Sequence, residues 1–133
     1  MRTGLMASCL RVFVAYACAA VACSCGGSSS SSSTTPSTTP TATNTVTITA
    51  SGVSPKDIVV SAGAQVTIVN NDNRNHEIAS DPHPEHTDCP ELDVFVVPGQ
   101  SRQSNNLVTR RVCGFHDHLN ADIKSLQGTI TIQ

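Results

Sequence analysis

Polar and apolar residues alternate with a period of two in three segments, residues 45–50, 65–70 and 129–132. Successive side chains of a β-strand point to opposite faces, so this alternation predicts strands with one solvated face and one buried face. Two shorter runs, 58–60 and 94–97, are more continuously apolar and are also typical of strands. The pattern therefore predicts strands throughout the part of the chain that follows residue 43.

Turn-forming residues separate these runs, and no segment after residue 43 shows helical spacing. The turn signals are Ser51-Gly52, Ser54-Pro55, Ala62-Gly63, Asn70-Asn71-Asp72-Asn73 and Pro98-Gly99. Roughly six to eight short strands in about 90 residues predict an all-β fold, a β-sandwich over residues 44–133.

The start of the chain, residues 1–25, has the pattern of an export signal. Arg2 and Arg11 supply positive charge, and the uncharged apolar run 12–22 is 11 residues long. That is shorter than the ~20 residues a membrane-spanning helix needs and suits a signal-peptide core. The small residues before Cys23 or Cys25 resemble the bacterial lipobox, which implies lipidation of one of these two cysteines. The alternative is an ordinary cleaved signal and free secretion.

Residues 26–43 form a segment of very different composition, in which fifteen of the sixteen residues 28–43 are Ser, Thr or Pro. Such a segment has almost nothing to bury, so it cannot offset the entropy lost on ordering. We expect a disordered tether between a membrane surface and the folded domain. Aspartate does not follow either candidate cysteine, which by resemblance favours the outer membrane or the cell surface.

Charge argues against a nucleic-acid partner. Charged residues make up 14% of the chain, the formal net charge is −2, and no basic stripe is present. Residues 44–133 hold ten acidic and six basic side chains, and 75–101 contains six acidic residues but no Lys or Arg. This acidic run is either a solvated face or an environment that attracts cations.

All five histidines lie in the predicted domain, in two groups that each contain a cysteine. The first group is His76, His83 and His86, followed by Cys89; the second is Cys113, His116 and His118. Imidazole and thiolate are the ligands that copper and zinc prefer. The two groups therefore indicate a metal site.

The same region resembles the cupredoxins, the blue copper proteins, over nearly all of 46–132. The resemblance is carried by residues 54–63 with 66–72, by His76, by residues 97–101, by Cys113-x-x-His116 and by Leu126-x-Gly128-x-Ile130. It implies a Greek-key sandwich that holds copper and transfers single electrons.

By that resemblance the copper ligands are His76, Cys113 and His116, with His118 as a further candidate. Leu126 stands where the family has its axial methionine, so the axial position is empty or is taken by Gln127 or His118. A trigonal site of this kind on a stiff frame changes little between oxidation states.

A second hypothesis pairs Cys89 with Cys113, because disulfides persist in exported proteins. Copper would then be held by histidines alone, mainly His76, His116 and His118 with His83 or His86, for storage, sensing or delivery. In the first hypothesis His83 and His86 are accessory or lid residues. A third hypothesis is a metal-free structural or binding sandwich.

We do not expect an enzyme. Cys113 and His116 are too close on one strand end to act as nucleophile and base, and no third group is evident to orient them. The expected partners are a redox protein or a copper-handling protein, together with the membrane through the lipid anchor. The expected location is the periplasmic face of a bacterial membrane.

Overall fold

The computed structural model describes residues 39–133, which contain ten strands and two short 3₁₀-helices. The strands are β1 (Thr41–Ala42), β2 (Thr45–Thr49), β3 (Gly52–Ser54), β4 (Asp57–Val60), β5 (Thr67–Asn70), β6 (His76–Ser80), β7 (Asp93–Val96), β8 (Ser101–Gln103), β9 (Arg111–Asp117) and β10 (Gly128–Ile132). The helices are η1 (His118–Asn120) and η2 (Lys124–Leu126). The expected signal peptide, its lipidation cysteines Cys23 and Cys25, and most of the expected tether lie outside the described residues.

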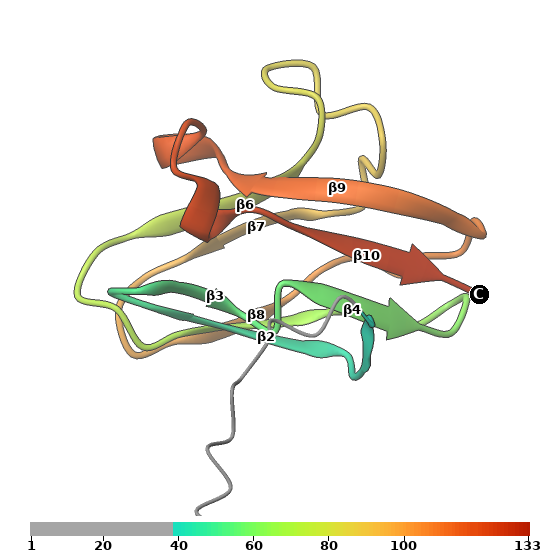
Figure 1. Ribbon diagram of the computed structural model, residues 1–133, viewed down its shortest axis with the longest axis horizontal. Helices are drawn as coiled ribbons and strands as arrows, with labels where there is room; N and C mark the ends of the chain where they lie inside the picture. Colours follow the sequence, from blue (N-terminus) through green and yellow to red (C-terminus); the bar gives the residue numbers. More distant parts are fainter. Residues whose placement is uncertain (1–38) are drawn as a thin grey trace, which may run out of the picture. The chain divides into compact units, whose positions relative to one another are not determined.

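The strands form two sheets that lie in two layers (Figure 1). One sheet has the order β1-β4-β10-β9-β6-β7, and the other has the order β3-β2-β5-β8. β10 pairs in parallel with β4 and antiparallel with β9, and β9 pairs antiparallel with β6. β9 therefore lies inside its sheet, with its far end beside η1.

The alternation along the chain sets which side chains fill the interior. Val46 and Ile48 on β2 are buried, and so are Ile130 and Ile132 on β10, while their neighbours are only partly buried. Branched aliphatic residues dominate the core, and Phe115 is its largest fully buried side chain. The expected all-β sandwich is confirmed, with the strands expected near 45–50, 58–60, 65–70, 94–97 and 129–132 all present.

Five of the ten strands, β1, β3, β6, β8 and β9, lie outside the runs from which the pattern predicts strands. β1 falls within the segment expected to be tether and pairs in parallel with β4, through Thr41 opposite Ile58 and Ala42 opposite Val59. β9 lacks simple alternation because three successive residues at its end, 115–117, are all buried. Both sides of β9 are covered at that point, which is the place where histidines were expected to gather.

A disulfide joins Cys89, which follows β6, to Cys113 on β9. Both residues are fully buried, and their Cα atoms are 5.9 Å apart. The hypothesis of paired cysteines is therefore the one that the structure supports. In residues 39–133, no helix is long and apolar enough to cross a membrane.

We expect the Cys89→Ala, Cys113→Ala double variant to have a free energy of unfolding about 2–4 kcal/mol lower than that of the parent domain. The reason is that the crosslink joins residues 24 positions apart and so restricts the unfolded chain. Urea unfolding of the metal-free domain, with and without reductant, measures this. Reductant should destabilise the parent domain and leave the double variant unchanged. Two free thiols in the denatured, unreduced parent domain would contradict the crosslink.

Candidate metal centre

Four histidines from three segments face one another. His83 and His86 lie in the loop between β6 and β7, His116 lies on β9, and His118 begins η1. One ring nitrogen from each lies within 4.8 Å of those of the others. In Figure 1 the loop is the yellow segment above β9. We call these four residues the histidine cluster.

His116 is the most constrained member of the histidine cluster. Its side chain is 2% exposed, and its Nδ1 lies 2.6 Å from Oδ1 of Asp81. Its Nε2 is buried and has no hydrogen-bond partner among the described residues. A buried imidazole nitrogen without a hydrogen-bond partner destabilises the folded state. Histidines that bind a metal through one ring nitrogen usually hydrogen-bond to a carboxylate, a carbonyl oxygen or water through the other.

The spacing of the other rings fits a shared metal ion. Nδ1 of His118 lies 3.0 Å from Nε2 of His86. Adjacent nitrogens bound at ~2.0–2.1 Å to one ion would be about 2.8–3.4 Å apart. The His83 ring centroid lies 4.9 Å from that of His118 and 5.2 Å from that of His116. The residues present therefore fit a metal with nitrogen ligands.

Electrostatics keeps His86 in the form that binds metals. Burial lowers the pKa of His86, and the neighbouring charges of His118, His116 and His83 lower it further. Asp93 acts in the opposite direction, and the net shift is downward. A neutral imidazole has a lone pair to offer, whereas a protonated one does not.

Hydrogen bonds within the loop hold His86 in place. The hydroxyl of Ser80 donates to the carbonyl oxygen of His86 at 2.9 Å and accepts from the amide of Cys89 at 3.0 Å. The amide of Asp88 donates to the carbonyl oxygen of Asp81 at 2.8 Å. His86 itself has a positive φ of 53°, so the loop turns sharply at a cluster residue.

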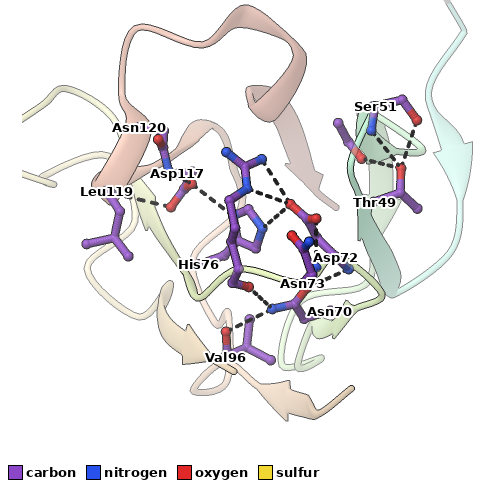
Figure 2. Close-up of polar contacts among 12 residues, drawn as sticks. Thr49, Ser51, Asn70, Asp72, Asn73, His76, Val96, Asp117, Leu119 and Asn120 are labelled. Atoms are coloured by element: carbon purple, nitrogen blue, oxygen red, sulfur yellow. Dashed lines mark hydrogen bonds and ion pairs between the residues drawn. The ribbon is translucent and has the colours of Figure 1, made fainter. Parts of the chain in front are cut away.

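His76, expected as a ligand, lies outside the histidine cluster. Its ring is fully buried, with Nδ1 2.9 Å from Oδ2 of Asp117 and Nε2 3.1 Å from Oδ2 of Asp72 (Figure 2). Asp117 also accepts hydrogen bonds from the amide of Glu77 and the side chain of Asn120. Both ring nitrogens of His76 are thus paired with carboxylates, and the structure does not bring His76 together with the other four histidines.

Cys113, the thiolate ligand of the first hypothesis, is bonded through its sulfur to Cys89, as the second hypothesis predicts. Leu126 is buried in the core, and Gln127 donates to the carbonyl oxygen of Ala121. The structure thus brings His116 and His118 together with both His83 and His86. The first hypothesis makes His83 and His86 accessory residues, and the second makes one of them a ligand. Asp81 was missed, since only the fold shows that it reaches His116.

Comparison with known proteins supports the fold. No protein-family model and no curated protein sequence matches the chain. Among solved structures, the oxidised plastocyanin of Dryopteris crassirhizoma is 20% identical, with a TM-score of 0.53, covering 67% of this chain and 99% of the plastocyanin. A reduced amicyanin mutant is 14% identical, with a TM-score of 0.54, covering 67% of this chain and 80% of the amicyanin. The domain has a cupredoxin-like fold.

We expect the free energy of unfolding of the Asp72→Asn variant to fall less steeply with decreasing pH than that of the parent domain. The amide of Asn73 holds the pKa of Asp72 below its usual 3.8; burial opposes this, and Arg74 and His76 reinforce it. Ionised Asp72 therefore stabilises the folded state at pH values above the pKa of an ordinary aspartate. This stabilisation is lost as the pH falls through the lower pKa that Asp72 has in the folded state.

The measurement is urea unfolding of the metal-free domain between about pH 5 and pH 2.5. Asp122→Asn, which removes an exposed carboxyl elsewhere, is the matched control. Identical pH dependence for the two variants would contradict the role assigned to Asp72.

Proposed function

We propose that this exported domain binds one copper ion through the histidine cluster, His83, His86, His116 and His118. The observation that carries the proposal is the buried Nε2 of His116, which has no hydrogen-bond partner in residues 39–133 and lies among three other imidazoles. A metal ion would satisfy this nitrogen and the others at once.

The donor set favours copper over other divalent ions. Four imidazole nitrogens suit copper and zinc, and copper(II) has the higher affinity for a given nitrogen site in the Irving–Williams order. The acidic residues around the loop add a field that attracts cations. The cupredoxin-like fold is a further argument, because the solved structures that it resembles include an amicyanin mutant described as Cu(I).

The disulfide changes the kind of copper chemistry available. With Cys113 bonded to Cys89, no thiolate faces the histidine cluster, so the intense blue colour of a cysteine–copper site is not expected. His83 is exposed, and it lies on a loop at the edge of the cluster. An open site of neutral nitrogen ligands suits storage of copper, or its transfer to a copper-handling partner.

One-electron transfer is the second candidate function. The similar plastocyanin and amicyanin structures are described in oxidised and reduced states. Here copper would supply the electron-carrying centre, while the sandwich would hold His116 and the disulfide would hold the loop of His83 and His86. A redox partner protein would then replace the copper-handling partner.

The test is copper(II) titration of residues 39–133 with the disulfide intact, followed by competition with nitrilotriacetate. We expect one equivalent of copper bound, with only a weak d–d band in the visible spectrum. Loss of a residue that hydrogen-bonds to a metal ligand typically weakens metal binding by about 10–100-fold. His116→Gln removes a ligand itself, so it should weaken copper binding by more than this.

His76→Gln is the matched control, because it makes the same change at a second buried histidine. It should lower stability but retain one equivalent of copper with an unchanged d–d band. Equal loss of copper in both variants would contradict the four-histidine site, and absence of copper binding by the parent domain would refute the function. Reversible voltammetry of the loaded domain would favour electron transfer over storage.

Export as a lipoprotein completes the proposal. Its support is the signal-like segment 1–25 with Cys23 or Cys25 at its end, and the disulfide, which persists in oxidising compartments. The domain would work at the periplasmic face of a bacterial membrane or on the cell surface, anchored by lipid through the tether.

A further inference from the structure

We infer that Asp81 is the positioning residue of the copper site, acting through His116. The inference rests on the proposed function, because it concerns how a ligand of that site is oriented. Asp81 itself does not belong to the histidine cluster and offers its carboxylate to the far side of the His116 ring.

The contact determines which nitrogen of His116 is free. A carboxylate only accepts hydrogen bonds, so Nδ1 of His116 carries the proton and donates to Oδ1 of Asp81 at 2.6 Å. In the neutral ring the lone pair is then on Nε2, the buried atom that has no partner among residues 39–133. Asp81 thus selects the tautomer and the ring orientation that a metal needs.

The backbone places Asp81 for this role. Its amide donates to the carbonyl oxygen of Gly114 at 2.9 Å, which ties the start of the loop to β9 two positions before His116. A Cβ on Gly114 would overlap the Asp81 carboxylate. The glycine leaves the space in which the carboxylate lies against the strand, so Gly114 and Asp81 act as a pair.

Asp88 provides a matched comparison within the same loop. It is exposed, and its carboxylate has no hydrogen bond or ion pair with the described residues 39–133. Removing Asp88 changes the local charge as much as removing Asp81 does, but leaves the His116 contact intact. Any difference between the two variants therefore reports the contact and not the charge.

The first experiment needs no metal. Two-bond ¹H–¹⁵N spectra of the metal-free domain should show His116 as the Nδ1–H tautomer in the parent domain and in Asp88→Ala. In Asp81→Ala the Nε2–H tautomer should appear. A parent domain with His116 as Nε2–H, or a tautomer that does not respond to Asp81→Ala, would overturn the inference.

The second experiment measures copper affinity by competition with nitrilotriacetate. Asp81→Ala should weaken binding by about 10–100-fold and shift the copper EPR parameters, whereas Asp88→Ala should change affinity by less than about twofold. Asp81→Asn keeps an acceptor oxygen without the charge, so it should fall between the parent domain and Asp81→Ala.

Gly114→Ala tests the same contact without a change of charge. It should weaken copper binding in the parent background and have a much smaller effect in Asp81→Ala, because the two changes remove one interaction. Strictly additive effects would overturn the pairing of Asp81 with Gly114. If the parent domain binds copper but Asp81→Ala and Asp88→Ala have the same copper affinity, the inference about Asp81 is wrong and the proposed function still stands. If the parent domain binds no copper, the proposed function is wrong.

Discussion

The Cys89–Cys113 disulfide joins the end of the loop that carries His83 and His86 to the strand that carries His116. Without this bond the loop would be held to β9 by the contacts of Asp81 at its start and by the ion pair between Glu91 and Arg111 near its end. His83 and His86 would then have more freedom to move away from the cluster. The crosslink also takes up the sulfurs of both cysteines in residues 39–133. One covalent bond therefore both ties the two parts of the histidine cluster together and leaves imidazole nitrogens as the donors that the cluster can offer a metal.

Buried carboxylates complete the frame around the histidine cluster. Burial opposes the ionisation of Asp117, yet hydrogen bonds from the Glu77 amide, His76 and Asn120 hold its pKa below the usual range. Asp117 also accepts from the amide of Leu119 as the N-cap of η1, the helix that begins at His118. His76 is bonded to Asp117 and has no place in the histidine cluster, whereas Asp81 contacts the cluster directly through His116.

Much of this could be predicted from the sequence, because period-two alternation depends on one physical fact, the burial of one strand face. Val46, Ile48 and Ile130 illustrate it, since each is buried between less buried neighbours. The two histidine-bearing segments also predict that imidazoles gather in one place, and four of the five histidines do. The sequence leaves the pairing of the cysteines open, because it does not give the distance between them.

The assignment of individual ligands could not be predicted in the same way. His76 follows an asparagine-rich turn and looks available in the sequence, but Asp72 and Asp117 flank its ring only once the β5–β6 connection and the end of β9 come together. His83 and His86 lie in a loop, where polar and apolar residues do not alternate regularly. The sequence therefore does not predict which way their side chains point. The role of Asp81 could not be predicted from the sequence, because its partner His116 is 35 positions away and only the fold brings the two side chains together.

The central claim is that the metal ligands are nitrogens of the histidine cluster and that the sulfurs remain bonded to each other. X-ray absorption spectroscopy of the copper-loaded domain tests this most directly, because imidazole and sulfur scatter differently. The account predicts a nearest shell of nitrogen with the outer-shell pattern of several imidazoles and no sulfur. A copper–sulfur distance in the nearest shell would contradict it and would restore Cys113 as a ligand.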